Sequence, residues 1–217
     1  MCIRDRCYSA SAVEYADNIL VAGGKDEKYY AIDIVEVYNS HHWAKVQCLP
    51  KPCWQMKSTV LNGHWYLMGG WRQGEEVYYA SLDSLVASSQ PSEKPLTSVW
   101  KRLTDVPHEH SSPAVFGNGL IAVGGGDPSS SSIHAYSPHT QSWLHVGDMP
   151  VELGKTCTVI LTTGELMVIG GSSNASIYDS RVHQASLNGN ESVTCKEHKS
   201  QHDMYVCISM HTCTTFP

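Results

Sequence analysis

Phenylalanine is almost missing from this chain of 217 residues, which has 2 Phe beside 11 Tyr and 6 Trp. Aromatic rings with a polar atom suit positions that pack on one side and form hydrogen bonds on the other. No apolar run approaches the roughly 20 residues that cross a bilayer. The first seven residues alternate charged and small apolar groups and do not form a signal-peptide core. We therefore expect neither a membrane protein nor a standard secreted protein.

Charged residues make up only 17% of the chain, and 41% of its residues are hydrophobic, a composition typical of a folded globular protein. Basic residues are the scarcer charged class, because 15 Lys and Arg face 21 Asp and Glu, for a net charge of -6. A surface that follows phosphate groups is built from clustered cations. Nucleic acid is therefore excluded as the expected partner.

Cysteine is also sparse, since eight in a chain of this length are too few for a small disulfide scaffold. The pairs Cys2/Cys7 and Cys48/Cys53 have a spacing that neither redox motifs nor zinc knuckles use. We expect Cys48, Cys53 and Cys157 to be free thiols and the protein to be cytoplasmic.

Four apolar runs each end in a glycine pair, and the first glycines of these pairs are 46, 55 and 46 residues apart. The pairs are Gly23-Gly24, Gly69-Gly70, Gly124-Gly125 and Gly170-Gly171. A turn sequence precedes each run, at Asp17-Asn18, Asn62-Gly63, Asn118-Gly119 and Thr163-Gly164. Asn-Gly between two apolar runs is a strong hairpin signal. A period of this size predicts a repeat architecture in which each unit opens with a hairpin.

A tyrosine follows each glycine pair, and in three units a tryptophan and a proline come after it. The sets are Tyr38, Trp43 and Pro50; Tyr79, Trp100 and Pro107; and Tyr136, Trp143 and Pro150, with Tyr178 alone in the fourth unit. These landmarks describe a four-stranded antiparallel sheet. Because one such sheet cannot bury both of its faces, radial stacking of the sheets is expected. The polar stretch 80–99 predicts a surface insertion.

Apolar-Gly-Gly followed by Tyr and Trp resembles the kelch repeat over about residues 9–193. The resemblance implies an all-β fold, a kelch-type β-propeller of four-stranded antiparallel blades. About three and a half to four blades are present, so we expect three complete sheets, a partial one and an incomplete ring. Residues 1–8 are then an unpatterned leader and 194–217 an irregular tail. We expect the chain to be a fragment; the alternative is a ring closed by a second copy or another protein.

The resemblance also implies that the loops after each glycine pair and before each hairpin lie on one face and contact a protein or peptide partner. The predicted partner-binding residues are Lys25, Trp71, Gly126 and Ser172 after the pairs, and Lys57, Ser58, Ser111, Ser112, Lys155 and Thr156 before the hairpins. Trp71 is the leading candidate, because aromatic anchors dominate interface energies. Its alternative role is to pack under a neighbouring blade. The repeat tryptophans Trp43, Trp100 and Trp143 are expected to hold the blades.

The predicted function is a protein-interaction module, and the resemblance suggests the substrate-recruiting part of a ubiquitin-ligase adaptor. A cytoskeletal, actin-associated scaffold is the first alternative, and a propeller enzyme of oxidase or sialidase-like type is the second. We expect no enzyme activity and no cofactor, because the sequence has no Asp-box motif and its glycine pairs lack the context of a phosphate-binding loop.

The tail holds six potential metal ligands: Cys195, His198, His202, Cys207, His211 and Cys213. Sulfur and imidazole are the ligands that zinc prefers. No paired Cys-x2-Cys knuckle is present, however, and the spacings match no common zinc finger. We therefore expect an irregular tail in place of a zinc site.

Overall fold

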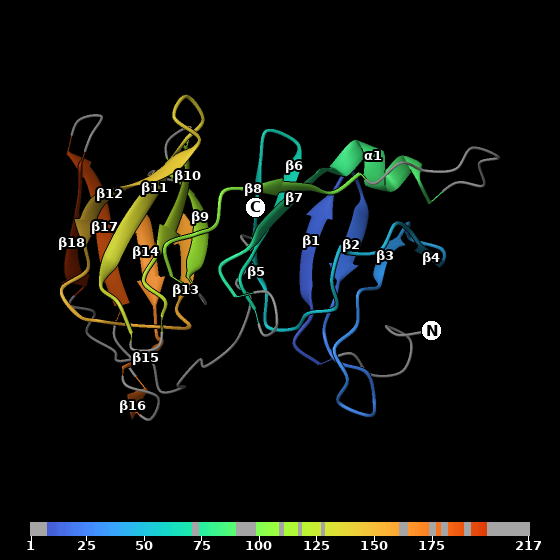
Figure 1. Cartoon of the computed structure of the whole chain (residues 1–217), viewed down its shortest axis with the longest axis horizontal. Coiled ribbons are helices and arrows are strands. Elements are labelled where there is room, and N and C mark those ends of the chain that lie inside the picture. Colours follow the sequence, from blue (N-terminus) through green and yellow to red (C-terminus); the bar gives the residue numbers. More distant parts are fainter. Residues whose placement is uncertain are drawn as a thin grey trace. The chain divides into compact units, whose positions relative to one another are not determined.

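The computed structural model describes residues 8–70, 74–89, 99–108, 111–116, 119–126, 129–160, 165–173, 177–178, 182–188 and 192–198. These residues are mostly in β-strands, and they contain one short helix. The chain divides into two compact units, Met1–Leu103 and Thr104–Pro217 (Figure 1). Each unit contains two four-stranded antiparallel sheets. The expectation of an all-β propeller built from four-stranded sheets is confirmed.

In the first unit, the strands of each sheet follow one another in chain order. The first sheet consists of β1 (Ser11–Tyr15), β2 (Asn18–Ala22), β3 (Val35–Tyr38) and β4 (Trp43–Lys45). The second consists of β5 (Lys57–Leu61), β6 (His64–Met68), β7 (Val77–Ser81) and β8 (Lys101–Leu103). The opening strands β1 and β5 contact each other, so the two sheets pack as neighbours.

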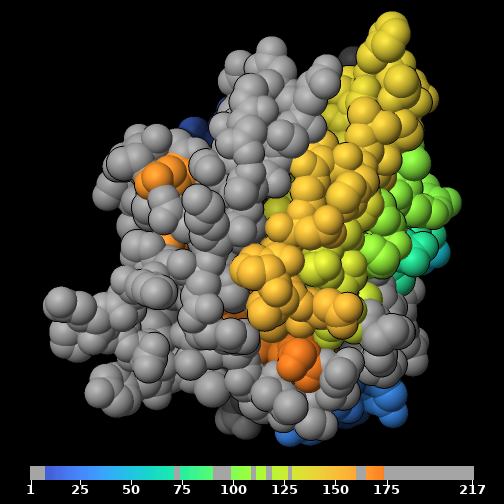
Figure 2. All heavy atoms as spheres, turned by 90° about the vertical axis from the view of Figure 1, so that its left-hand side faces the viewer, coloured from blue at the N-terminus to red at the C-terminus, as the bar shows by residue number. Residues whose placement is uncertain are grey.

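The second unit repeats this plan. Its first sheet contains β9 (Ser112–Phe116), β10 (Gly119–Val123), β11 (Ser132–Ser137) and β12 (Ser142–Asp148). The other contains β13 (Cys157–Ile160), β14 (Leu166–Ile169), β17 (Val182–Asn188) and β18 (Ser192–His198). Strand β12 lies at the edge of its sheet, and Figure 2 shows this part of the chain, in yellow, on the surface.

The fourth sheet differs from expectation in two ways. It is complete, because β18 pairs with β17 along its whole length and extends to His198, beyond the end of the recognised pattern at residue 193. Tyr178 does not mark its third strand but lies in β16 (Ile177–Tyr178), which pairs only with β15 (Ser172–Ser173). The fourth strand was missed because no tryptophan or proline marks it.

The glycine pairs occupy one place in all four sheets, directly after the second strand. The first glycine of each pair has a φ of 59° to 62°, and the second has a φ of 100° to 116°. Residues other than glycine rarely adopt such backbone angles. The pairs therefore mark one backbone shape that is repeated four times.

Hairpin turns were predicted less well than the glycine pairs. Asn62 and Gly63 have φ angles of 49° and 69°, as a type I′ turn requires. In the first sheet, however, the two turn residues are Ala16 and Asp17, with φ angles of 47° and 61°. That turn lies one residue before its predicted place. The predicted turn at Thr163-Gly164 lies outside the described residues, as does Asn118.

Each unit has its own hydrophobic core, formed where its two sheets face each other. In the first unit, Leu20 and Ala22 belong to the same buried cluster as Trp65 and Leu67 of the neighbouring sheet. In the second unit, Ile121 and Val123 share a cluster with Leu166 and Val168 in the same way. Counted back from the glycine pair, the first sheet of each unit contributes the first and third residues of its second strand, and the neighbouring sheet contributes the second and fourth. The two sheets of a unit therefore meet with opposite faces of this strand.

The insertion within residues 80–99 is more ordered than predicted. After β7 the chain forms α1 (Leu82–Ala87), whose Leu82 and Leu85 are fully buried in the core of the first unit. Ser81 caps the helix by accepting a hydrogen bond from the Ser84 amide. Residues 90–98 lie outside the described part of the chain. The spacing of Leu82, Leu85 and Val86, three and four residues apart, was the missed helix signal.

The repeat tyrosines and tryptophans form cross-strand ring pairs in two of the sheets. Tyr38 stands opposite Trp43, with ring centroids 5.1 Å apart, and Tyr136 stands opposite Trp143 at 5.4 Å. In the second sheet the insertion separates these landmarks. Tyr79 stacks on Tyr66 there, and Trp100 packs on Trp65 inside the core. Of the three repeat tryptophans, Trp100 is the one that is buried.

Within the described ranges, no helix combines the length and the apolar composition that a bilayer crossing requires.

Candidate partner-binding surface

The predicted hairpin-entry residues are largely buried on or next to the opening strands. Lys57 is 8% exposed, Ser111 and Ser112 are each 2% exposed, and Thr156 is fully buried. Ser111 donates hydrogen bonds to the carbonyl oxygens of His108 and Gly124, which fixes the start of its hairpin. In this structure these side chains are engaged within the fold, and their contact with a partner stays a prediction.

Hydroxyl groups join the opening strands of neighbouring sheets in both units. The Ser11 hydroxyl donates to the Ser58 hydroxyl at 2.6 Å. In the second unit, Ser112 contacts the Thr158 hydroxyl at 3.3 Å and donates to the Thr156 carbonyl oxygen at 3.0 Å. Ser11 and Ser112 hold the same register, because each pairs with the residue before a glycine pair. Ser58 and Ser112 therefore link sheets to one another.

In both units, a loop after a glycine pair contacts a loop before a hairpin. In the second unit, Gly154 and Ser172 exchange two backbone hydrogen bonds of 2.9 Å, and Ser129 donates to the Ser172 carbonyl oxygen. Ser172 is 7% exposed, and the neighbouring Lys155 and Gly126 are partly buried. Trp71, the leading candidate, lies outside the described residues.

In the first unit, the same meeting of loops produces an aromatic surface. Lys25, directly after the glycine pair, extends over Trp54 in the loop before β5, and its Nζ lies 3.2 Å from the ring centroid. The backbone of Lys25 also pairs with Tyr8 through hydrogen bonds of 2.9 and 3.2 Å. A cation over an indole ring is attracted by the negative face of the π-system. Of the predicted partner-binding residues, Lys25 is thus the one that lies beside the aromatic rings of this surface.

Three exposed tyrosines complete this surface, which we name the tyrosine surface: Tyr8, Lys25, Tyr29, Tyr30 and Trp54. Tyr29 and Tyr30 are each 68% exposed, and Tyr8 is 45% exposed. The rings of Tyr8 and Tyr29 stack with centroids 5.7 Å apart and an interplanar angle of 8°. Among the described residues, five large apolar side chains are exposed, and three of them are these tyrosines. Exposed aromatic groups gathered in one place indicate an interaction site.

Asp26 holds the loop that presents Tyr29 and Tyr30. Its carboxylate accepts hydrogen bonds from the amides of Lys28 and Tyr30, both at 2.9 Å. Its own amide donates to the Tyr30 carbonyl oxygen at 3.0 Å, and its carbonyl oxygen accepts from the Tyr29 amide at 2.9 Å. Tyr29 has a φ of 63°, an unusual value for a bulky residue. Strained backbone of this kind persists where its surroundings fix it, and it is common at binding sites.

The sequence interpretation identified Lys25 but missed Tyr8, Tyr29, Tyr30 and Trp54. It used the tyrosines that recur with the repeat and gave no role to the others. A signal was present, because Tyr29-Tyr30 lies between a glycine pair and the third strand, where no repeat position requires an aromatic residue. The cluster itself could not be predicted, since Tyr8 and Trp54 reach it from other loops.

Among the predicted partner-binding residues, Lys57 is the lysine with a strongly lowered pKa. Burial lowers its pKa from the ordinary 10.5 to about 8. A charged ammonium loses hydration on entering the interior, so the neutral form is favoured there. Burial of the charged Lys57 side chain therefore costs folding free energy at neutral pH.

We predict that Lys57→Met stabilises the protein at pH 7 by about 2 kcal/mol. Between the folded pKa and the unfolded value, the unfolded chain binds the proton that the folded chain releases. Wild-type stability should therefore rise as the pH increases from about 8 to 10.5, and this rise should be smaller in Lys57→Met. Urea unfolding of both proteins at pH 7, 8, 9 and 10 measures the difference. Parallel pH profiles would show that Lys57 does not titrate in this range.

The cysteine prediction is confirmed for two residues and wrong for the third. Neither Cys48, which is exposed, nor Cys53, which is buried, forms a disulfide. Burial raises the pKa of Cys53 to about 12, with a further contribution from Glu76, so its thiol is inert at neutral pH. Cys157 is disulfide-bonded, contrary to the expectation of a free thiol. Sequence spacing could not reveal this, because disulfide pairing depends on the fold.

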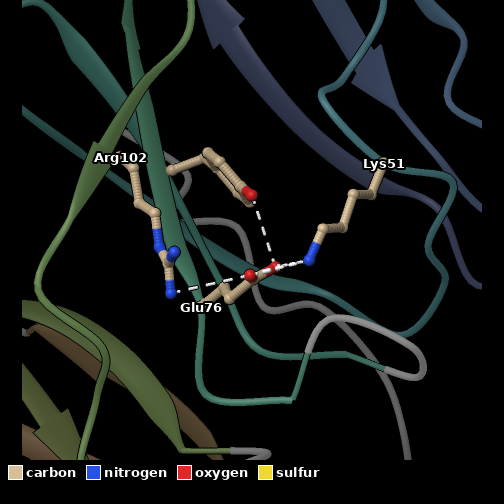
Figure 3. A network of polar contacts seen from close by, with 4 residues as sticks. Lys51, Glu76 and Arg102 are labelled. Atoms are coloured by element: carbon tan, nitrogen blue, oxygen red, sulfur yellow. Dashed lines mark hydrogen bonds and ion pairs between the residues drawn. The ribbon is translucent and has the colours of Figure 1, made fainter.

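An ion network lies on the second sheet (Figure 3). The Lys51 ammonium donates to both oxygens of Glu76 at 2.7 and 2.8 Å, and Arg102 Nη2 lies 3.6 Å from the same carboxylate. The Tyr78 hydroxyl donates to Glu76 at 3.3 Å. The hydrogen bond to Glu76 raises the pKa of Lys51, and burial together with Glu76 raises the pKa of Tyr78. Because both cations are half-exposed, the network contributes little to stability.

Three histidines form a row on the third sheet. The ring of His134 lies 5.8 Å from that of His108 and 5.5 Å from that of His145, whose Nε2 is 3.1 Å from Asp148. Burial lowers the pKa of His134, and the two neighbouring rings lower it further. Among the described side chains, no group of three or more His, Cys, Asp or Glu is placed to hold a metal ion. The backbones of Cys195 and His198 lie in β18, while the other four tail ligands lie outside the described residues.

Comparisons with known proteins agree with this architecture. The kelch motif matches residues 109–150, which contain the third sheet. A search of curated proteins found no match. Among solved structures, 196 chains match. One of them, "Structure of YjhT", aligns with a TM-score of 0.68 and 13% identity over 91% of this chain and 66% of its own length. This chain therefore spans slightly less than two thirds of that structure. Residues 109–150 thus match the kelch motif, and the chain has the fold of a kelch-type β-propeller.

Proposed function

We propose that this chain is a protein-interaction module that captures a partner protein through the tyrosine surface. The observation that carries the proposal is the exposure of Tyr29 and Tyr30 on a loop that four hydrogen bonds of Asp26 hold in place. Loops on a rigid scaffold commonly carry function. A kelch-type propeller provides such a scaffold, and protein binding is the role that the sequence resemblance implies.

Tyrosine is well suited to this role. Its ring offers a large contact area, it has only two side-chain torsions to fix, and its hydroxyl can form hydrogen bonds at the edge of an interface. Tyr and Trp are also enriched among the residues that carry most of the binding energy in protein interfaces. Because the loop is already ordered, binding avoids much of the entropy cost of fixing it. These properties favour partner capture at this surface.

The finer parts of the proposal come from the sequence. We propose that the partner is recruited as a substrate of a ubiquitin ligase, that the chain has no catalytic activity of its own, and that it works in the cytoplasm. The domains fused to this segment in a longer protein would distinguish an adaptor from an actin-associated scaffold or a propeller enzyme. Stable disulfides are rare in the cytosol, so the disulfide at Cys157 makes the proposed location testable. Thiol titration under denaturing, non-reducing conditions tests the location.

The test is affinity purification of partners with the wild type, Tyr30→Ala and Trp71→Ala, together with a thermal melt of each protein. We expect Tyr30→Ala to reduce partner recovery at least fivefold, a loss typical of an interface residue that contributes more than about 1 kcal/mol. Its melting temperature should stay nearly unchanged, because the side chain is 68% exposed. Trp71→Ala tests the residue that the sequence favoured.

The matched control is Leu144→Ala, which removes a 51% exposed apolar side chain from β12, a strand of the second unit. Recovery with this variant should equal that of the wild type. Full partner recovery with a folded Tyr30→Ala protein would move the binding site away from the tyrosine surface. A large fall in its melting temperature would show instead that the ring supports the fold.

A further inference from the structure

The tyrosine surface already binds one cation of its own chain. The Lys25 ammonium lies 3.2 Å from the centre of the Trp54 ring. This contact shows that a positive charge is accepted among these rings. The Lys25 ammonium is therefore already in contact with the Trp54 ring in the free protein.

The other rings of the surface remain open beside acidic side chains. Tyr29 and Tyr30 are each 68% exposed, and one face of Tyr29 is stacked on Tyr8. The same loop carries Asp26 and the exposed Glu27, whose charges are balanced by Lys25 and the exposed Lys28. The chain as a whole has a net charge of -6. Long-range attraction therefore favours a positively charged partner segment.

We propose that the tyrosine surface recognises an arginine-containing basic segment of its partner, an inference that rests on the proposed function. The planar guanidinium stacks on an open tyrosine ring, as the Lys25 ammonium does on Trp54. The phenol oxygens accept its N–H groups, and Glu27 provides the opposite charge. Arginine fits better than lysine, because its flat, weakly hydrated head group loses less on leaving water and stacks on aromatic faces.

The experiment uses the whole chain and three synthetic peptides of equal length: one with alternating Arg and Gly, one with Lys for each Arg, and one with Glu for each Arg. Isothermal calorimetry at 50 mM and 300 mM NaCl measures the affinity of each peptide. We expect the Arg peptide to bind more tightly than the Lys peptide, by roughly threefold, and the Glu peptide not to bind. Salt should weaken the binding of both basic peptides.

Variants separate stacking from charge attraction. Tyr30→Ala should weaken the Arg peptide by roughly three- to fivefold, while Tyr30→Phe, which keeps the ring, should retain most of the affinity. Glu27→Lys reverses a charge on an exposed side chain and should weaken both basic peptides, more strongly at 50 mM than at 300 mM NaCl. Leu144→Ala should bind as the wild type does. If Tyr30→Ala fails to fold, the Tyr30→Phe and Glu27→Lys data decide the question.

The inference is overturned if the Glu peptide binds as well as the Arg peptide, if no peptide binds, or if Tyr30→Ala and Glu27→Lys leave Arg-peptide affinity unchanged. Such results are distinguishable from failure of the proposed function. Affinity purification can still show a partner that depends on Tyr30, and its binding segment would then have another chemistry. If partner recovery also does not depend on Tyr30, both the basic-segment inference and the proposed function are rejected.

Discussion

Replacing Gly23 by alanine should destabilise the first unit by about 3 kcal/mol or more. Gly23 has a φ of 62°, and a Cβ atom there would lie 2.6 Å from both the Cys53 carbonyl oxygen and Met56 Cε. The carbonyl cannot move easily, because it accepts a hydrogen bond of 2.8 Å from the Gly24 amide. Left-handed strain and overlap with fixed backbone therefore act together. Urea unfolding of the purified variant measures the loss.

Gly74→Ala is the matched control, since Gly74 has nearly the same φ of 61° but no heavy atom within 4 Å of an added Cβ. It should cost only about 1 kcal/mol, from backbone strain alone. The difference between the variants then reports the steric overlap at the glycine pair. Equal losses in the two variants would show that the sheets yield at Gly23, and the close approach would not explain the repeat glycines.

Replacing Trp65 by alanine should cost about 3–5 kcal/mol, because Trp65 is the largest fully buried side chain among the described residues. Trp65 packs on Trp100, with ring centroids 6.1 Å apart, in the cluster that also contains Leu20 of the neighbouring sheet. The cavity would therefore open where the two sheets meet. Thermal and urea unfolding, followed by tryptophan fluorescence and far-UV circular dichroism, measure the change.

Trp43→Ala provides the comparison within the same unit. Trp43 is partly exposed and packs mainly on Tyr38, so its loss should cost about 1 kcal/mol. Trp65→Phe should also be mild relative to Trp65→Ala, because the indole N–H of Trp65 has no hydrogen-bond partner among the described groups. A loss for Trp43→Ala as large as for Trp65→Ala would contradict the packing described above.

The sequence predicted the architecture well where backbone geometry constrains the residue. A glycine pair recurs because each second strand ends in the same left-handed turn, and this signal survived in all four sheets. The Tyr–Trp landmark was less reliable, because several ring arrangements can fill the same space. In the second sheet, Tyr79 stacks on Tyr66 and Trp100 on Trp65. In the fourth sheet the landmark is lost, although the strand remains.

The candidate site was harder to predict. Position in the repeat correctly brought Lys25 to the loop region, but it could not distinguish Lys57, which is buried, from an exposed loop residue. Burial of Lys57 depends on the neighbouring sheet. The tyrosine surface combines side chains from three loops, so its assembly depends on the tertiary fold. The Cys157 disulfide is a further case, because cysteine spacing carries no information on which thiols meet.

The hydrogen bonds that Asp26 forms within its loop have a kinetic consequence. A loop that is ordered before encounter imposes no slow rearrangement on association, so the association rate is set by diffusion, orientation and charge. Substitution of Tyr30 should then act mainly by shortening the lifetime of the complex. Removal of the Asp26 carboxylate should act differently, because a partner would meet a loop that must first find its bound shape. Surface plasmon resonance distinguishes the two cases. The Tyr30 substitution should give faster dissociation, and removal of the Asp26 carboxylate should give slower association.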